Sequence, residues 1–372
     1  MPLYQDHATM ASVEEPDLHA ADSYNYALPA ELIAQDPLAD RSAARLLVVN
    51  RADGSLAHRS IRDLPGLLVP GDLVVVNDTK VVPARLLGHR AKTGGTWEGL
   101  FLRVEGSGSQ AGAWIVLAQT RGRPDVGERI VLTGRDGAEG QSLELLGRAE
   151  GGAWLARPLG AAANEPAEAV LARVGRVPLP GYIRGGVERD GDLDRYQTVF
   201  AREAGSAAAP TAGLHFTPEL FADLAARGVE RAAVTLHVGL GTFRPITADS
   251  LDGHVMHSEW CTCPADTVEA VQRTKARGGR VVAVGTTAVR TLETAARAGT
   301  LSPWSGATDL FITPGFPFRV VDALLTNFHM PRTTLMVLVS ALATRDLVMR
   351  AYAEAIRERY RMLSYGDAML IL

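Results

Sequence analysis

Three histidines, an arginine and a glutamate gather in one part of this chain, within the segments 210–217 (PTAGLHFT), 235–245 (TLHVGLGTFRP) and 257–260 (HSEW). They are His215, His237, Arg244, His257 and Glu259. Imidazole and carboxyl groups exchange protons near neutral pH, so the cluster predicts general acid and base catalysis. A single histidine is more often structural, and the prediction therefore rests on the group.

A glycine turn, Gly239-Leu240-Gly241, lies inside the same stretch and follows a predicted strand. Such a turn lets the backbone approach a nucleoside closely. Pro245 interrupts the helix that a dinucleotide-binding fingerprint requires, so an ordinary tight turn is an equal alternative.

The segment 284–293 (VGTTAVRTLE) has the pattern of a strand, a turn and the start of a helix. Thr286 and Thr287 would then stand beside unpaired backbone N–H groups, with Arg290 one turn farther along. A helix start of this kind can receive an anion or a carboxylate. The alternative is that a threonine only caps the helix while Arg290 faces solvent.

The segment 77–86 (NDTKVVPARL) ends a hydrophobic strand with Asp78 and places Arg85 where a second domain should begin. A cleft between two domains would bring both side chains to its walls. Taken alone, the segment is better explained by an Asx-type turn with exposed charged side chains.

Two kinds of sequence pattern surround these segments. Short apolar stretches separated by glycine-rich turns fill the region from Leu86 to Leu159 and predict a small β-barrel. Strand patterns at 46–77, and alternating helix and strand patterns after 178–186, indicate one α/β unit that the barrel interrupts.

Local signals place several of the elements of this α/β unit. Thr217 can cap a helix that starts at Pro218 and closes at Gly228, and a strand should follow at 232–238. The next unit is a helix from Pro264 to Ala276, a strand at 280–284, and a helix that starts at Thr286 or Thr287.

Composition narrows the class of protein. The chain has 372 residues, 47% of them hydrophobic, which exceeds the usual size of a single core and predicts two domains. Its 38 Lys and Arg nearly balance 42 Asp and Glu, so any RNA contact must be a local patch. We expect neither a membrane span nor a signal peptide. Residues Met1 to Ser23 are expected to form a loose tail.

The two cysteines, Cys261 and Cys263, bear on compartment and metal binding. They are too close together to suggest a disulfide framework, and they lack partners at metal-ligand spacing. We therefore expect a reduced, cytoplasmic protein without a metal site.

Many of these segments together resemble the ribosyltransferase-isomerases of the queuosine pathway. The similar segments run in order from Tyr26 to Leu372 and are 28–49 (LPAELIAQDPLADRSAARLLVV), 77–86, 195–217 (RYQTVFAREAGSAAAPTAGLHFT), 235–243 (TLHVGLGTF), 257–260, 284–293, 308–315 (TDLFITPG), 326–335 (TNFHMPRTTL) and 364–372 (SYGDAMLIL). Lys80, Ala204 and Ala288 stand where arginine, proline and serine are common in that family. These departures weaken inference from Lys80 and from the hydroxyl missing at Ala288.

The resemblance implies a fold and its boundaries. The fold is a three-layer α/β domain with a mixed sheet, carrying an inserted all-β barrel. We place the tail at 1–23, the α/β catalytic domain at 24–84 and 176–372, and the barrel at 85–175.

The resemblance also implies a reaction. A transferase of this family moves the ribosyl part of S-adenosylmethionine onto an aminomethyl-deazaguanine in tRNA and rearranges it to an epoxycyclopentane, releasing adenine and methionine. S-adenosylmethionine is thus a consumed substrate, and no metal or redox cofactor is required. One group must take a proton from C5′ and another should assist the departure of adenine.

The resemblance suggests tasks for the candidate residues. The histidine and glutamate cluster with Arg244 would transfer protons, with Asn327 and His329 as a second tier. Binding of S-adenosylmethionine would fall to Thr286, Thr287, Arg290 and Asp309, and contact with tRNA to Asp78 and Arg85. A run of cations at 273–280 is a weaker RNA candidate, because such runs usually face solvent.

We expect a monomer whose partners are tRNA and S-adenosylmethionine. Two rival functions remain. An S-adenosylmethionine-dependent RNA methyltransferase would fit the glycine turn, and a non-catalytic RNA-binding module would need no histidine cluster and fits poorly with the net negative charge.

Overall fold

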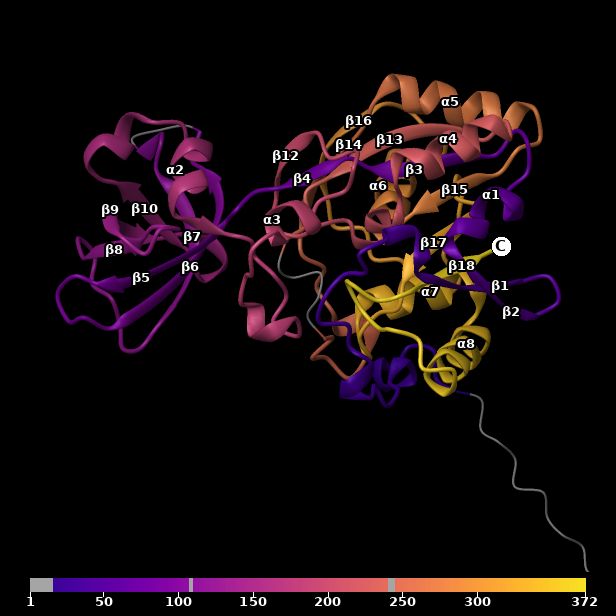
Figure 1. Ribbon diagram of the computed structural model, residues 1–372, viewed down its shortest axis with the longest axis horizontal. Helices are drawn as coiled ribbons and strands as arrows, with labels where there is room; N and C mark the ends of the chain where they lie inside the picture. The colour runs from indigo at the N-terminus through magenta and orange to yellow at the C-terminus, as the bar shows by residue number, and fades with distance from the viewer. Residues whose placement is uncertain (1–15, 107–109, 240–244) are drawn as a thin grey trace, which may run out of the picture.

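The computed structural model describes residues 16–106, 110–239 and 245–372. Figure 1 shows a large body of strands and helices beside a smaller body of strands, joined by crossings of the chain near β4 and α3. The prediction of an α/β unit with an inserted β-barrel is confirmed.

The large body is built on one nine-stranded mixed sheet with the strand order β16-β14-β13-β3-β15-β17-β18-β1-β2. Its strands are β1 (Arg45–Val49), β2 (Leu56–Ser60), β3 (Leu73–Asn77), β13 (Glu230–Leu236), β14 (Glu259–Cys263), β15 (Val281–Val284), β16 (Trp304–Thr308), β17 (Ala323–Asn327) and β18 (Ala368–Ile371). The neighbours β13, β3, β15 and β17 are parallel. Their carboxyl ends therefore meet at one edge of the sheet, where ligands bind in open α/β folds.

Helices cover both faces of this sheet and make three layers. They are α1 (Leu64–Leu67), α4 (Pro218–Ala226), α5 (Ala265–Ala276), α6 (Thr286–Ala295), α7 (Thr334–Ala343) and α8 (Arg345–Arg357). Alternate residues of β15 pack on opposite sides: Ala283 joins the core under α5 to α8, and Val282 joins the core under α1 and α4. Burial on both faces explains why these strands are continuous apolar runs.

The helix starts expected from local signals are confirmed. The Thr217 hydroxyl accepts a hydrogen bond from the backbone N–H of Leu220 at 3.2 Å, and Pro218 is the first residue of α4. Helices α5 and α6 begin at Ala265 and Thr286, as expected. Strand β13 lies two residues earlier than predicted, so His237 follows the strand instead of lying within it.

The smaller body is a closed antiparallel barrel. Six strands form the ring β5-β6-β7-β10-β9-β8, and pairing of β8 with β5 closes it. They are β5 (Arg85–Arg90), β6 (Thr96–Val104), β7 (Trp114–Thr120), β8 (Arg129–Thr133), β9 (Glu139–Arg148) and β10 (Trp154–Pro158). Buried Trp97, Trp114 and Trp154 fill the interior, and α2 (Ala167–Val174) packs on the same core.

Short elements link the two bodies. Strand β4 (Thr79–Val81) pairs with β12 (Glu203–Ser206), β11 (Gly175–Arg176) pairs with β5, and α3 (Asp192–Arg195) lies nearby. The short 3-10 helices are η1 (Ala21–Tyr24), η2 (Ala30–Leu32), η3 (Arg41–Ala43), η4 (Ile61–Asp63), η6 (Glu150–Gly152), η7 (Gly160–Asn164), η8 (Arg184–Gly186), η9 (Thr211–His215) and η11 (Leu251–Gly253).

Folded structure begins before residue 24, where we expected a loose tail to end. Ala21 and Tyr24 are fully buried in the main core, and the Tyr24 hydroxyl donates to the carbonyl of Leu18 at 2.8 Å. The apolar surface of Tyr24 explains this docking, while residues 1–15 lie outside the described part of the chain. No helix of the described residues is long and apolar enough to cross a membrane.

Candidate active site

The carboxyl ends of the parallel strands are tied together by one amide side chain. Asn77 Oδ1 accepts from the backbone N–H groups of Leu236 (3.0 Å) and Thr79 (3.1 Å). Its Nδ2 donates to the Leu236 carbonyl at 3.0 Å and to Thr287 Oγ1 at 3.1 Å. Asn77 thus fixes the ends of β3 and β13 and the start of α6 relative to one another.

His237 lies directly beyond β13, against this network. Its Nδ1 is 2.8 Å from Thr79 Oγ1, and that hydroxyl is 3.4 Å from the carbonyl oxygen of Glu203, to which it can only donate. Thr79 thus occupies Nδ1, while Nε2 has no hydrogen-bond partner among the residues that the structure describes. Burial lowers the pKa of His237, while Glu203 and Asp78 act in the opposite direction, so the ring is neutral at neutral pH.

The position of the His237 ring requires a glycine at residue 205. Gly205 has φ of +145°, and a Cβ added there would lie 3.1 Å from both Cε1 and Nε2 of His237. A side chain at this position would meet the ring and would strain the backbone. Sequence reasoning overlooked Asn77 and Gly205 and gave Thr79 no role, although Asn77 and Thr79 flank Asp78 at the end of an apolar strand.

Glu259 and Arg290 form a buried ion pair, and both side chains are only 3% exposed. Glu259 Oε1 also accepts from the backbone N–H of Gly239 at 2.8 Å, and Arg290 Nε donates to the Leu310 carbonyl at 3.1 Å. The pair therefore holds the beginning of the glycine turn against α6. Arg290 Nη2 is buried without a hydrogen-bond partner in the described part of the chain.

His215 is buried and bonded within the protein. Its Nε2 is 3.2 Å from Asn327 Oδ1, while Asn327 Nδ2 donates to the carbonyls of Leu363 (2.9 Å) and Ser364 (3.3 Å). Burial lowers the pKa of His215 to about 4, even though the Asn327 and Arg41 hydrogen bonds raise it. These contacts are typical of a histidine that joins loops.

The three histidines do not form one cluster. Asn327, which holds His215, ends β17, whereas His237 follows β13, with β3 and β15 between them. At the usual strand spacing these positions are about 14 Å apart. His257 is exposed, and Arg244 lies outside the described residues.

Comparison with known proteins identifies the family of the chain that carries this site. The family model described as "Queuosine biosynthesis protein" matches residues 21–371. The chain belongs to the queuosine biosynthesis protein family.

Two relatives in this family carry the name S-adenosylmethionine:tRNA ribosyltransferase-isomerase. The protein of Stenotrophomonas maltophilia is 51% identical over 348 residues, covering 94% of this chain and 97% of the relative. That of Symbiobacterium thermophilum is 50% identical over 351 residues, covering 94% and 98%. The crystal structure of S-adenosylmethionine tRNA ribosyltransferase from Thermotoga maritima is 39% identical, covers 94% of this chain and 100% of that one, and has a TM-score of 0.53.

In this member of the queuosine biosynthesis protein family, Thr286 and Thr287 are buried at the start of α6. Neither caps the helix: the N-cap residue is Gly285, which makes no side-chain capping bond, and Thr287 Oγ1 instead accepts from Asn77. The alternative of a simple threonine cap is therefore wrong. Asp309 is exposed and pairs with Arg297 at 3.4 Å, away from these contacts.

The two residues expected to face tRNA are engaged within the protein. The buried Asp78 carboxylate accepts from Thr235 Oγ1 at 2.7 Å and pairs with Arg202 at 2.9 Å. Arg85 Nε donates to Glu98 at 2.7 Å, and its Nη1 donates to the carbonyl of Gly186. Arg85 thus ties the barrel to the linker, and its charge is paired with Glu98.

His329 resembles His215 in being internally bonded, since its Nε2 lies 3.0 Å from Thr326 Oγ1. Burial lowers its pKa to about 3. Among the residues that the structure describes, no three His, Cys, Asp or Glu side chains converge so that they could hold a metal ion.

Proposed function

We propose that this chain transfers the ribosyl part of S-adenosylmethionine to the aminomethyl-deazaguanine of a tRNA and isomerises it to an epoxycyclopentane, with release of adenine and methionine. The names of its relatives supply the two substrates, and their similarity extends over nearly the whole length of both chains. The geometric observation that supports the proposal is a neutral, oriented imidazole, His237, at the ligand-binding edge of the sheet.

In the proposed reaction, His237 Nε2 removes one of the C5′ hydrogens, which the adjacent sulfonium makes acidic. The proton goes to Nε2 and the electron pair stays on C5′ until adenine is expelled. The amine of the deazaguanine then adds to the unsaturated sulfonium, and methionine leaves as the ring and epoxide close. S-adenosylmethionine is consumed, so this scheme needs no further cofactor.

His237 is a better base than the other histidines because of its contacts. His215 uses Nε2 to hold Asn327, and His329 uses Nε2 to contact Thr326, and both rings are deeply buried. His237 is half-buried, and its Nε2 has no hydrogen bond to any residue within the described ranges. A base needs a free lone pair in reach of the substrate.

We assign the buried Glu259 to positioning, because its oxygens already hold Arg290 and the Gly239 turn. For the methionine carboxylate we propose the start of α6, because the backbone N–H groups of the first helical residues, Thr286 and Thr287, have no acceptor within the helix. Arg290 Nη2, which is buried without a hydrogen-bond partner among the described residues, offers one more N–H donor on the same helix. Of the residues expected to bind S-adenosylmethionine, Asp309 has the least support, because it is exposed and pairs with Arg297.

For contact with tRNA, Lys80 is a better candidate than Asp78 and Arg85. It is exposed, follows Thr79 directly, and has no ion-pair partner among the described residues. In contrast, the cations of the run at 273–280 each pair with a carboxylate; the pairs are Arg273–Glu269, Lys275–Asp322, Arg277–Glu230 and Arg280–Asp72.

We also propose that the protein acts as a cytoplasmic monomer. One chain supplies all of the candidate site residues, and tRNA and S-adenosylmethionine meet in the cytoplasm. The two cysteines are free and buried, in keeping with a reducing compartment.

The test is a product analysis. Purified protein is incubated with S-adenosylmethionine and tRNA that carries the aminomethyl-deazaguanine, and unmodified tRNA serves as the control. We expect adenine and methionine in equal amounts, and a mass increase on the modified tRNA alone. Stoichiometric S-adenosylhomocysteine would instead identify a methyltransferase, and binding without any product would identify an RNA-binding module.

A further inference from the structure

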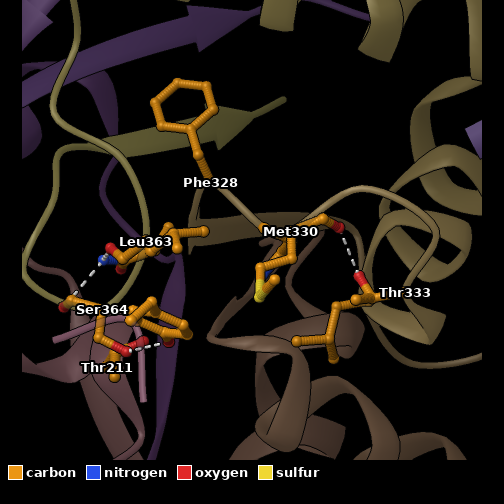
Figure 2. Close-up of a pocket in the computed structure, with 10 residues that line it drawn as sticks. Thr211, Phe328, Met330, Thr333, Leu363 and Ser364 are labelled. Atoms are coloured by element: carbon orange, nitrogen blue, oxygen red, sulfur yellow. Dashed lines mark hydrogen bonds between the residues drawn. The ribbon is translucent and has the colours of Figure 1, made fainter. Parts of the chain in front are cut away.

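Two cavities in the structure differ greatly in size. Figure 2 shows the smaller one, at the carboxyl end of β17, with Met330, Thr333 and Ser364 in its walls. Its volume is about 20 Å³, room for about one water molecule. The larger one lies between the barrel and the linker segment 178–186 and has a volume of about 350 Å³. Ligand pockets span roughly 300 to 1,000 Å³, so of these two only the larger can take a substrate group.

The outer face of the barrel forms the floor of the larger cavity. Alternate residues of β6 and β7 fill the barrel core, and the residues between them point outward. Strand pairing places the outward Glu98 opposite Gln119, and Leu100 opposite Leu117, while Arg85 of β5 lies opposite Leu100. All five residues line the cavity. Strands β6 and β7 lie on the side of the barrel that faces the large body (Figure 1).

The linker supplies the opposite wall. Pro178 and Leu179 are buried there, and Gly181, Gly185 and Gly186 present backbone without side chains. A Cβ added at Gly181 or at Gly185 would meet no atom within 4 Å, so both glycines border open space. Leucine side chains on the floor and bare peptide groups on this wall suit the two faces of a planar aromatic ring.

Two polar side chains of the floor keep hydrogen-bonding capacity. Glu98 Oε1 accepts from Arg85 Nε at 2.7 Å, but Oε2 makes no hydrogen bond within the described part of the chain, and the side chain is 43% exposed. The exposed Gln119 amide makes none there either. A carboxylate can only accept, whereas an amide also donates. The matching edge of a ligand therefore offers adjacent donors with an acceptor beside them.

A guanine-type base has such an edge. Its N1–H and 2-amino groups donate side by side and its O6 accepts, and a 7-deazaguanine keeps all three groups. Adenine instead presents a lone pair at N1, which a carboxylate repels. Arg85 and Glu98 balance each other in charge, so the cavity suits an uncharged ring better than a phosphate. Proteins commonly read unstacked RNA bases by this edge.

The cavity adjoins the His237 site. Leu100 packs against Ala207, and the backbone N–H of Ala207 donates to the carbonyl of Val238 at 3.1 Å. Val238 directly follows His237. In an aminomethyl-deazaguanine the amine is carried by C7 of the five-membered ring, away from N1 and the 2-amino group. A base held by its N1 edge at Glu98 therefore leaves the amine free to react.

We propose that this cavity binds the aminomethyl-deazaguanine of the tRNA, turned out of the anticodon stack. Glu98 accepts from N1–H and the 2-amino group, and Gln119 donates to O6. The inference rests on the proposed function for the identity of the base. It adds the place where that base binds, on the outer face of the barrel, and the edge by which it is read.

The test fills the cavity and compares three probes. Gln119→Trp places an indole at an exposed strand position, where tryptophan is well tolerated. Guanosine, inosine, which lacks the 2-amino group, and methionine are titrated calorimetrically against the whole protein. We expect the wild-type protein to bind guanosine at least about fivefold more tightly than inosine, and Gln119→Trp to weaken guanosine at least about tenfold. Methionine affinity should change by less than about twofold.

A second variant and a matched control isolate the contacts. Glu98→Gln keeps the size of the side chain and removes the carboxylate, so it should abolish most of the preference for guanosine over inosine. Glu144→Trp adds the same indole at an outward position of β9, between Leu143 and Leu145 of the barrel core and across the ring from β6. It should leave guanosine binding unchanged. Thermal unfolding verifies that each variant is folded.

Several results would overturn the proposal. They are an absence of guanosine binding to the wild-type protein at millimolar concentration, wild-type guanosine affinity in folded Gln119→Trp, an unchanged preference over inosine in Glu98→Gln, loss of methionine binding instead of guanosine binding, or an equal loss in Glu144→Trp.

Product analysis separates this site from the proposed function. If S-adenosylhomocysteine is formed while Gln119→Trp still loses guanosine, the reaction is wrong and the base site stands. If adenine and methionine are released and Gln119→Trp keeps the wild-type KM for the modified tRNA, the base site is wrong and the reaction stands.

Discussion

Replacing His237 tests the central assignment, because its half-buried imidazole lies at the ligand-binding edge of the sheet and its Nε2 has no hydrogen-bond partner within the described ranges. We expect His237→Ala to lower kcat for adenine release by about 10² to 10⁴, the usual effect of losing a general base. The ring packs against Gly205 and bonds to Thr79 but is only half-buried, so the cost in stability should be modest.

Thr79→Val separates orientation from proton transfer. It removes the hydroxyl that lies 2.8 Å from Nδ1 and leaves the imidazole in place. One neutral hydrogen bond contributes about 0.5 to 1.5 kcal/mol, so kcat should fall roughly two- to tenfold, far less than in His237→Ala.

The dependence of the reaction rate on pH provides an independent test of the His237 assignment. Burial lowers the pKa of His237, so the active neutral form should persist below the ordinary pKa of a histidine. The rate should therefore fall as pH decreases through a value below 6.5, and the acid limb should disappear in His237→Ala.

The assay is single-turnover release of adenine at saturating S-adenosylmethionine and modified tRNA, with thermal unfolding as the control for folding. His215→Ala is the matched comparison, and it should affect stability more than turnover because His215 links η9 to Asn327. A folded His237→Ala protein with near wild-type turnover would refute the assignment of the base.

Three further predictions follow from other contacts. Gly205→Ala should lower kcat by displacing the imidazole of the base, since its Cβ would lie 3.1 Å from that ring, and an unchanged kcat would show that the ring can yield without loss of function. Burial lowers the pKa values of His215 and His329 from 6.5 to about 4 and about 3. The free energy of unfolding should therefore be greatest above pH 6.5 and fall progressively as pH decreases toward 4. Urea unfolding at a series of pH values checks this, and a midpoint that does not change over that range would contradict it. Lys80→Ala should reduce the magnitude of the salt slope of tRNA binding by roughly 0.7 to 0.9. Arg85→Ala should leave the slope unchanged, because the Arg85 guanidinium is already paired with Glu98. Filter binding over a salt series distinguishes the two variants, and the reverse result would place Arg85 on the RNA surface.

Much of the architecture could be predicted because its signals are local. The hydroxyl of Thr217 and the fixed φ of Pro218 act on the helix that follows them, and both lie within one turn of its start. Glycine-rich turns between short apolar strands likewise predicted the barrel, since each hairpin is specified by neighbouring residues.

The candidate site could be predicted only in part. Residues around Asp78, His237 and Thr286 were expected to matter because each follows an apolar strand, and the parallel strand order does bring these strand ends to one edge. The sequence contains no comparable sign that Asn77 joins three of these segments, or that Gly205 is needed beside an imidazole.

By itself the sequence determined the class of fold and the positions of helix starts, because caps, turns and apolar periodicity act between near neighbours. It indicated the family through the many similar segments that run in order along the chain. Only the tertiary structure decided which partner each histidine ring bonds to and how deeply each ring is buried. The contact between Thr79 and His237 spans 158 residues, and that between His215 and Asn327 spans 112. Hydrogen-bond partners and desolvation come from strand order and loop packing, so chemically identical side chains acquire different roles.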